Sequence, residues 1–179
     1  PIYPTREAID YAPKMGLYIS KMKEVFDYYL ENLFNNSGGI DVTNFKETLR
    51  TIFSPKKTQN CVKCGGGYRQ PLIGVDVNGE IYPCDFFWGR KDYCLGNIGT
   101  HSVSDAVRSP ENFRNYRKLD DLSDCISCDW KTFCGAGCPG ASVIMEEGVA
   151  AKDHYCEYTQ EMLKYVIDKK RLHRINNPK

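Results

Sequence analysis

The residues best suited to chemistry in this sequence are its cysteines, of which there are nine among 179 residues. Five of them fall within 32 residues, in the pattern C-x2-C-x5-C-x3-C, then seventeen residues, then C. They are Cys125, Cys128, Cys134, Cys138 and Cys156. Small and turn-forming residues flank Cys138 at positions 135–140. The backbone can therefore bend sharply enough for several sulfur atoms to point at one centre. The pattern predicts a cage of thiolate ligands.

The remaining four cysteines lie upstream, and two of them form another C-x2-C pair. They are Cys61, Cys64, Cys84 and Cys94. A disulfide framework prefers an even number of cysteines and a secreted protein, whereas this set is odd in number and carries no export signal. We therefore expect metal ligation in the reducing cytoplasm.

The residues leave the kind of metal site open. The two C-x2-C pairs could form one tetrahedral zinc site with four thiolate ligands. That arrangement gives no role to Cys84, Cys134, Cys138 and Cys156. Eight or nine thiols fit two four-thiolate sites better, and iron–sulfur clusters accept four thiolates, sometimes with one ligand from a distant motif. A thiol oxidoreductase is a weaker alternative, because neither pair has a clear strand-to-helix thioredoxin context.

The upstream spacing Cys64-x14-Gly79-x4-Cys84, followed by the five-cysteine pattern, resembles the seven-cysteine pattern of the SPASM domain. SPASM domains are C-terminal extensions of radical S-adenosylmethionine (radical SAM) enzymes, including anaerobic sulfatase-maturating enzymes and maturases of ribosomally made peptides. The resemblance covers roughly residues 61–160. It includes the Tyr-Pro-Cys-Asp segment around Cys84 and the Leu-Gly-Asn-Ile segment at residues 95–98.

The resemblance implies two auxiliary [4Fe–4S] clusters with interleaved ligands. The first cluster would take Cys64, Cys84 and Cys138. The second would take Cys125, Cys128, Cys134 and Cys156. The fourth ligand of the first cluster varies in the family; here Cys61 ranks first, an open iron site second and Cys94 third.

The resemblance also implies a function in oxidation, or in thioether or carbon–carbon bond formation, on a precursor peptide or protein. The clusters would accept an electron from the substrate radical, or bind and orient the substrate. The sequence lacks the C-x3-C-x2-C motif of S-adenosylmethionine cleavage, so this chain is not expected to cleave that molecule by itself. The expected partners are a radical SAM barrel domain of the same enzyme and the peptide or protein substrate, with an external electron donor or acceptor as a further candidate. The alternative is a stand-alone iron–sulfur electron carrier or a zinc-stabilised binding module.

Composition narrows the classes of partner further. A net charge of +1 gives no reason to expect nucleic acid. No run approaches eighteen apolar residues, so no membrane span is expected. The N-terminus begins Pro-Ile-Tyr-Pro, without an initiator Met, and we expect a C-terminal piece of a longer protein.

Helices are predicted on both sides of the cysteines. Residues 1–16 are expected to be extended, and apolar residues at 3–4 spacing predict a helix over residues 17–34. A second helix is predicted over residues 43–53 with Asp41 as N-cap. Its buried side would contain Val42, Phe45, Leu49, Ile52 and Phe53. A last helix is predicted after Cys156, ending in the basic residues 169–171.

A β-hairpin is predicted between the two cysteine groups. Residues 72–77 and 80–82 flank Asn78-Gly79, which favours a type I′ turn. The hairpin would bring Cys84 back toward Cys64. The next three residues, Phe86, Phe87 and Trp88, could form an apolar wall beside a cluster or simply fill the core.

These elements predict an α+β fold of SPASM type, with a small hairpin and short helices around two metal clusters. The expected division is residues 1–57 as a helical linker or barrel end, 58–160 as the SPASM domain and 161–179 as a C-terminal helix and tail. His154 is the histidine most suited to a hydrogen bond near a ligand, because Cys156 lies two residues further on. Asp85 and Asp129 each follow a cysteine, where they could tune a cluster, touch substrate or serve only in turns.

Overall fold

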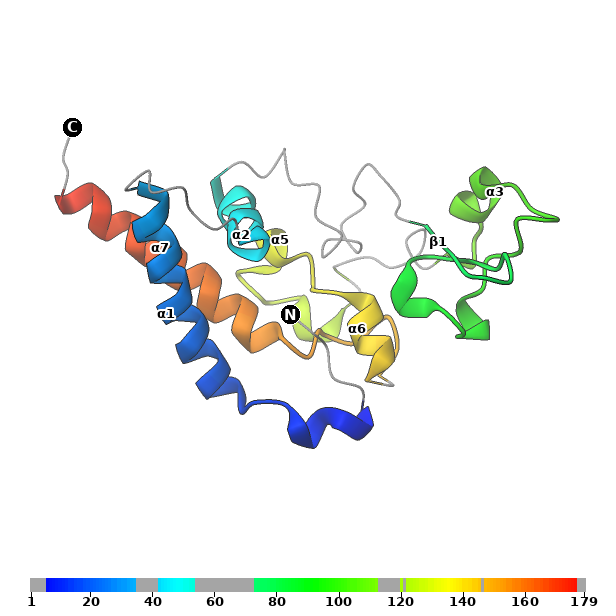
Figure 1. Ribbon diagram of the computed structural model, residues 1–179, viewed down its shortest axis with the longest axis horizontal. Helices are drawn as coiled ribbons and strands as arrows, with labels where there is room; N and C mark the ends of the chain where they lie inside the picture. The colour runs from blue at the N-terminus through cyan, green and yellow to red at the C-terminus, as the bar shows by residue number, and fades with distance from the viewer. Residues whose placement is uncertain are drawn as a thin grey trace. The chain divides into compact units, whose positions relative to one another are not determined.

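The computed structural model describes residues 6–34, 42–53, 73–112, 120, 122–145 and 147–176. Figure 1 shows the elements, with 3₁₀ helices denoted η. In chain order they are η1 (Arg6–Tyr11), α1 (Met15–Phe34), α2 (Thr43–Phe53), β1 (Gly74–Val75), β2 (Ile81–Tyr82), η4 (Asp85–Phe87), η5 (Lys91–Tyr93), α3 (Val103–Arg108), η7 (Ser123–Cys125), α5 (Lys131–Cys134), α6 (Pro139–Ile144) and α7 (Cys156–Asn176). Helices with one small antiparallel sheet confirm the α+β fold class. Within the described ranges, every helix is too short or too polar to cross a membrane.

The chain divides into two compact units. We call Tyr11–Thr58 with Tyr155–Lys179 the helical unit, and Pro1–Asp10 with Gln59–His154 the cysteine unit. Each unit has hydrophobic clusters of its own. The division that the sequence predicts at residues 57 and 160 stays a prediction.

The helical unit is built from α1, α2 and α7, and α1 lies alongside α7 (Figure 1). Its core joins residues from all three helices: Phe26, Tyr29, Phe45, Met162 and Val166. The predicted helices over residues 17–34 and 43–53 are confirmed, the first beginning two residues earlier. Asp41, the predicted N-cap, lies outside the described residues.

Three predictions about the helices and the N-terminal segment are wrong. Phe53 is 40% exposed, because it is the last residue of α2, beyond the contact with the core. Residues 1–16 are not extended throughout: η1 covers Arg6–Tyr11, a stretch without proline, and the effect of a proline on helical geometry is confined to its neighbourhood in the chain. The last helix does not end at the basic residues but continues to Asn176.

The predicted hairpin is present in the cysteine unit. β1 and β2 pair antiparallel, with Gly74 opposite Tyr82 and Val75 opposite Ile81. The predicted type I′ turn is wrong, because Asn78 is not among the described residues with positive φ, and that turn needs positive φ at both central positions.

The hairpin turn is instead fixed by Asp76. The Gly79 N–H donates to the Asp76 carbonyl at 3.0 Å, and Gly79 has a φ of 78°. The Asp76 side chain accepts from the N–H groups of Asn78 and Glu80, each at 2.9 Å. In the turn that these bonds stabilise, Gly79 is the last residue and the only left-handed one. This is the conformation of the common three-residue hairpin loop.

The Leu-Gly-Asn-Ile segment at residues 95–98 lies along the second side of β2. The Ile81 N–H donates to the Gly96 carbonyl and the Leu95 N–H to the Ile81 carbonyl, both at 2.8 Å. The Ile98 N–H donates to the Gly79 carbonyl at 2.8 Å. The segment thus extends the hairpin by one irregular stretch, which includes an isolated bridge between Glu80 and Asn97.

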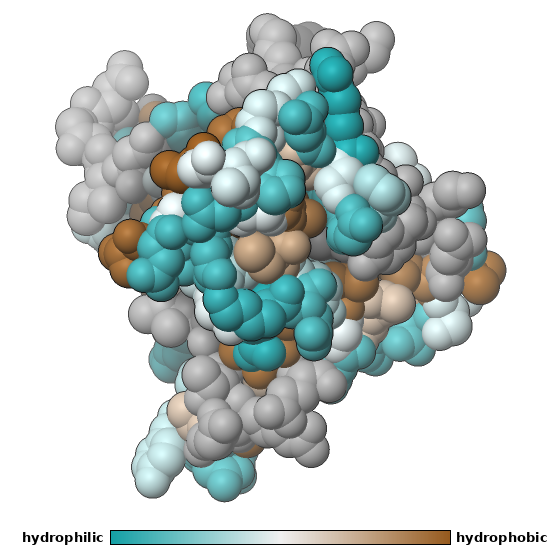
Figure 2. All heavy atoms as spheres, turned by 90° about the vertical axis from the view of Figure 1, so that its right-hand side faces the viewer, coloured by the Kyte–Doolittle hydropathy of each residue, from teal (hydrophilic) through white to brown (hydrophobic). Residues whose placement is uncertain are grey.

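Figure 2 faces the side of the molecule that carries the hairpin and α3. Hydrophilic residues cover much of the centre of this face, and the hydrophobic residues lie in separate places among them. The exposed apolar side chains of this part include Val77, Ile98 and Val103. Scattered apolar residues of this kind are ordinary on protein surfaces.

Candidate metal centre

Cys84 is placed by the hairpin and the 3₁₀ helix η4. It follows β2 after Pro83, has an extended backbone and is 7% exposed. It packs in a buried cluster with Tyr82, Phe87 and Val143. The Phe87 N–H donates to the Cys84 carbonyl at 3.1 Å, which turns the chain directly after the cysteine. The sulfur of Cys84 therefore lies in apolar surroundings.

The three aromatic residues at positions 86–88 differ in how deeply they are buried. Phe87 is completely buried and Phe86 packs against the same cluster, so both fill the core. The backbone of α6 approaches them closely: a Cβ at Gly140 would lie 2.5 Å from Cβ of Phe86. Trp88 is 52% exposed. Of the three, Trp88 has the most exposed side chain, and Phe86 is half-buried.

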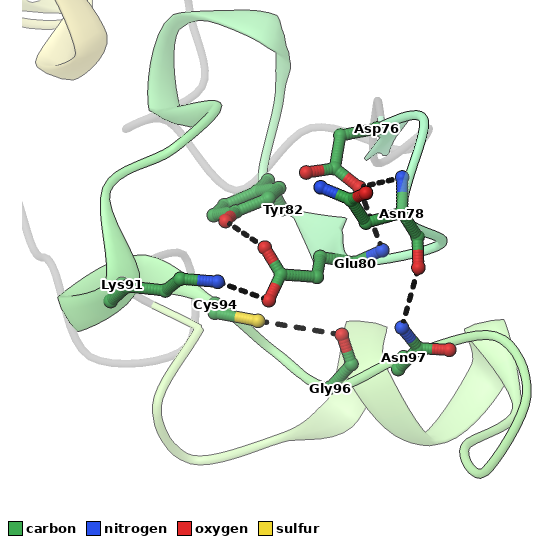
Figure 3. Close-up of polar contacts among 8 residues, drawn as sticks. All are labelled: Asp76, Asn78, Glu80, Tyr82, Lys91, Cys94, Gly96 and Asn97. Atoms are coloured by element: carbon green, nitrogen blue, oxygen red, sulfur yellow. Dashed lines mark hydrogen bonds and ion pairs between the residues drawn. The ribbon is translucent and has the colours of Figure 1, made fainter.

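A polar network fixes the return strand that leads to Cys84, as Figure 3 shows. The Tyr82 hydroxyl donates to Glu80 Oε2 at 2.8 Å, and the Lys91 ammonium donates to Glu80 Oε1. The hydrogen bond from Lys91, with that from Tyr82, lowers the pKa of Glu80. Burial, with the hydrogen bond to Glu80, raises the pKa of Tyr82. The ion pair of Glu80 with Lys91 joins the return strand of the hairpin to η5.

Cys94 lies in the same region, and its thiol donates to the Gly96 carbonyl at an Sγ–O distance of 3.4 Å (Figure 3). It packs partly buried against the cluster around Tyr82 and Phe87. In this arrangement Cys94 acts as a small packing residue with a weak hydrogen bond.

Asn97, next along the chain, connects this segment to the hairpin turn. Its Nδ2 donates to the Asn78 carbonyl at 2.9 Å, and its Oδ1 accepts from the Gly99 N–H at 2.9 Å (Figure 3 shows the first bond). His101 Nδ1 lies 2.8 Å from the Thr100 hydroxyl oxygen on the exposed side of this loop. His101 therefore belongs to a surface turn.

The downstream cysteines sit on short helical turns. Cys125 ends η7, is 6% exposed and packs with Leu122 and Ala136. The Cys128 N–H donates to the Cys125 carbonyl at 3.1 Å, so the C-x2-C pair forms one tight turn. Cys134 ends α5. The three cysteines of the C-x2-C-x5-C pattern therefore lie at or beside short helical turns.

The chain between Cys134 and Cys138 is left-handed at three consecutive residues. Gly135, Ala136 and Gly137 have φ values of 67°, 61° and 73°. Ala136 is the one residue other than glycine with positive φ in the described part of the chain, a conformation that costs about 1–2 kcal/mol. Strained backbone of this kind gathers at functional sites, where the surrounding structure enforces it.

Cys138 is held by a residue that the sequence analysis did not single out. Its N–H donates to Asp153 Oδ2 at 2.8 Å, and Asp153 is 4% exposed. The only available sequence signal was an acidic residue three positions before Cys156, too weak a pattern to single it out. A buried carboxylate beside a predicted ligand is therefore a finding of the structure.

Cys156 is the first residue of α7 and belongs to the helical unit. The Gln160 side chain donates to its sulfur at 3.3 Å, one helical turn along. The predicted ligands Cys61 and Cys64 lie outside the described residues. Asp85 and Asp129 are exposed, and His154 is half-buried.

The donor chemistry of the described cysteines fits an iron–sulfur site. All seven are thiols without a disulfide among them: Cys84, Cys94, Cys125, Cys128, Cys134, Cys138 and Cys156. In the part of the chain that the structure describes, no three His, Cys, Asp or Glu side chains are gathered as a metal site. The first predicted ligand set extends to Cys61 and Cys64, and the second draws Cys156 from the other unit. The ligand assignments therefore stay predictions.

Comparison with known proteins decides the kind of domain. Residues 64–129 match the SPASM family, an iron–sulfur cluster-binding domain. These matched residues are a SPASM domain. The matched part of this SPASM domain begins at Cys64 and includes Cys84 and Cys128. The later cysteines, Cys134, Cys138 and Cys156, follow the matched residues.

The similarity to known proteins extends beyond the matched residues of the SPASM domain. The chain is 26% identical over 170 residues to a cysteine-type anaerobic sulfatase-maturating enzyme of Clostridium perfringens, covering 93% of this chain and 44% of that enzyme. It resembles the structure of native anSMEcpe with bound AdoMet at a TM-score of 0.72 and 25% identity, covering 100% of this chain and 48% of the other. The structure of native anSMEcpe with AdoMet and the Cp18Cys peptide matches with the same values. The chain thus spans about half the length of these relatives.

Proposed function

We propose that the SPASM domain holds two [4Fe–4S] clusters. The first would be bound by Cys64, Cys84 and Cys138, and the second by Cys125, Cys128, Cys134 and Cys156. The match of residues 64–129 to an iron–sulfur cluster-binding domain carries this proposal. The burial of Cys84 and Cys125 supports it, because shielding from water is one of the factors that set the potential of a cluster.

For the fourth ligand of the first cluster, Cys61 remains the first choice and an open iron site the second. Cys94 stays third. Its thiol donates to the Gly96 carbonyl and packs beside Phe87, and binding iron would require that arrangement to change.

The domain would serve as the auxiliary part of a radical SAM enzyme that modifies a peptide or protein. The similarity to an anaerobic sulfatase-maturating enzyme, over 93% of this chain, supports this role. S-adenosylmethionine would bind to a barrel domain of the same enzyme. In the proposed division, residues 1–57 lead from that barrel, 58–160 form the SPASM domain and 161–179 form the C-terminal helix and tail.

When bound, such clusters supply one-electron chemistry, for oxidation of a substrate or for thioether or carbon–carbon bond formation. The residues of this chain would hold the clusters, keep water from their sulfur atoms and offer an exposed surface beside Cys84. Asp85 and Trp88 are the exposed side chains of that surface. A peptide is the substrate class to test, because a related structure contains the Cp18Cys peptide.

The first experiment measures iron, acid-labile sulfide and zinc in the anaerobically purified protein, with its ultraviolet–visible spectrum. We expect roughly eight irons per chain with matching sulfide and a broad band near about 400 nm from this domain. About one or two zinc ions without sulfide would contradict the proposal and leave a zinc-stabilised module.

Serine variants at single cysteines then test the ligand sets. Replacing Cys84 or Cys125 is expected to remove about half of the iron, because each would belong to a different cluster. Cys94→Ser is the matched control, a cysteine of the same unit that is expected to keep the full iron content. Loss of iron from the Cys94 variant would move Cys94 into the ligand set, and full iron in the Cys84 and Cys125 variants would contradict the assignment.

A further inference from the structure

Asp153 is a buried carboxylate packed directly against the loop that carries Cys138. It is 4% exposed and accepts the Cys138 N–H at 2.8 Å. Gly137 leaves room for it: a Cβ there would lie 2.2 Å from the Asp153 Cβ and 2.5 Å from its Oδ2. The left-handed φ of 73° at Gly137 also disfavours any side chain. The loop and the carboxylate are therefore fitted to each other.

Ser142 makes a second connection between the same two segments. It is completely buried, and its hydroxyl lies 3.2 Å from the carbonyl oxygens of both Ala151 and Lys152. The hydroxyl donates to these carbonyls from α6, while Asp153 accepts from the residue just before α6. Residues 151–153 are thus joined to residues 138–142 by polar bonds in both directions.

We propose that Asp153 is a positioning residue for the metal ligand Cys138. It fixes the backbone of Cys138 by accepting its N–H at 2.8 Å. The inference rests on the proposed function, in which Cys138 binds the first cluster. Asp153 would then keep the Cys138 loop in the conformation that presents its sulfur to that cluster, as residues that support a ligand do at other metal sites.

The test compares Asp153→Ala, which removes the acceptor, with Asp153→Asn, which keeps a carbonyl oxygen able to accept the Cys138 N–H. Asp129→Ala is the matched control, since Asp129 is close in sequence to a predicted ligand, Cys128, but is exposed. The measurements are iron per chain, the rate of iron release to a chelator, and the electron paramagnetic resonance spectrum of the reduced protein.

For Asp153→Ala we expect iron release to be faster by on the order of 10–100-fold, with loss of one cluster signal. The Asn variant and the Asp129 control are expected to stay near the wild-type rate with both signals present. Wild-type release and spectrum in Asp153→Ala would overturn the proposal. Equal losses in the Asn and Ala variants would also overturn it, because the hydrogen bond would then not be what holds the ligand.

Ser142→Ala gives an independent measurement should Asp153→Ala not fold. It removes only the second connection, and we expect iron release several-fold faster than wild type. Iron release from Ser142→Ala at the wild-type rate would contradict a role for the bonds between residues 138–142 and 151–153. If the wild-type protein itself binds no iron and sulfide, the proposed function fails and this inference with it. A loaded wild type with unaffected variants overturns the inference only.

Discussion

The two units of this molecule are stabilised by different kinds of contact. In the helical unit, α1, α2 and α7 share one continuous apolar core, in which the rings of Phe26 and Phe45 meet edge to face with centroids 5.1 Å apart. The described part of the cysteine unit has short helices, a two-residue strand pair and several small clusters. Its order depends on turns and on bonds between side chain and backbone.

This difference has a thermodynamic consequence. Helices of about one or two turns are unstable by themselves, because nucleation is costly and few hydrogen bonds repay it. Long helices with a shared apolar face gain stability from burial instead. We therefore expect the helical unit to fold without metal and the cysteine unit to depend on the proposed clusters, since ligand binding and folding are linked.

The largest expected effect comes from removing the metal. Chelation of a cluster-loaded protein is expected to abolish hydrogen-exchange protection in the cysteine unit, for example at the amides of Cys125 and Cys134. The amides of α1 and α7 are expected to keep their protection. Hydrogen exchange with mass spectrometry measures both regions in one sample. Loss of protection in both units together, or in neither, would contradict the comparison.

Phe26→Ala tests the comparison from the other side. Phe26 is completely buried in the helical core, and its truncation is expected to cost about 3–5 kcal/mol of unfolding free energy. Denaturant unfolding followed by far-ultraviolet circular dichroism measures the loss. Val25→Ala is the control, because the neighbouring Val25 is 47% exposed, and a change within about 0.5 kcal/mol is expected. If Phe26→Ala also removes protection from the Ile81 amide, the two units do not unfold separately.

The helical unit could be predicted from sequence because its pattern is local. The period of apolar residues marks α1 and α2 almost to their ends. Val25 and Leu33 are among the apolar residues of that repeat, yet they are 47% and 50% exposed. Periodicity identifies the side of a helix, whereas the residues that are buried depend on where the partner helices end.

For the cysteine unit, the domain family could be predicted from the sequence, but the contacts that hold its cysteines in place could not. The residue types and spacing indicated a SPASM domain, and the comparison confirms it. The contact of Asp153 with Cys138 joins residues fifteen positions apart, and no local pattern announces it. The hairpin was predicted from Asn78-Gly79. Its turn type depends on the side chain of Asp76, which accepts hydrogen bonds from the backbone N–H groups of Asn78 and Glu80.

Glycine substitutions test how far turns stabilise the cysteine unit. Gly79→Ala and Gly89→Ala both place a side chain at positive φ, which costs about 1–2 kcal/mol. At Gly79 the new Cβ would also lie 3.0 Å from Cγ1 of Ile98, whereas Gly89 has nothing within 4 Å. We therefore expect the larger loss at Gly79. Faster hydrogen exchange at the Ile98 amide, which donates to the Gly79 carbonyl, measures it. Equal effects of the two variants would show that the contact with Ile98 adds nothing.

The smallest expected effect concerns a surface ion pair of the helical unit. Lys23 donates to Glu161 at 2.8 Å, and this bond lowers the pKa of Glu161. A carboxyl whose pKa is lower in the folded state stabilises the protein above its unfolded pKa of about 4.3, and this contribution disappears as the pH falls through the folded pKa.

Glu161→Gln is therefore expected to lower stability at pH 7 and to flatten its decline below about pH 5. The Glu161 side chain is 43% exposed, so water screens the pair and the loss is expected to be only about 0.2–1 kcal/mol. Unfolding curves at several pH values measure it, with Glu24→Gln as control, because the Lys21–Glu24 pair has the same 2.8 Å distance but is 64% and 60% exposed. A smaller effect at Glu24 would show that partial burial, rather than the distance between the charges, sets the contribution of a pair. A loss at Glu161 approaching that of Phe26→Ala would mean that the helical unit depends on charge as much as on its apolar core.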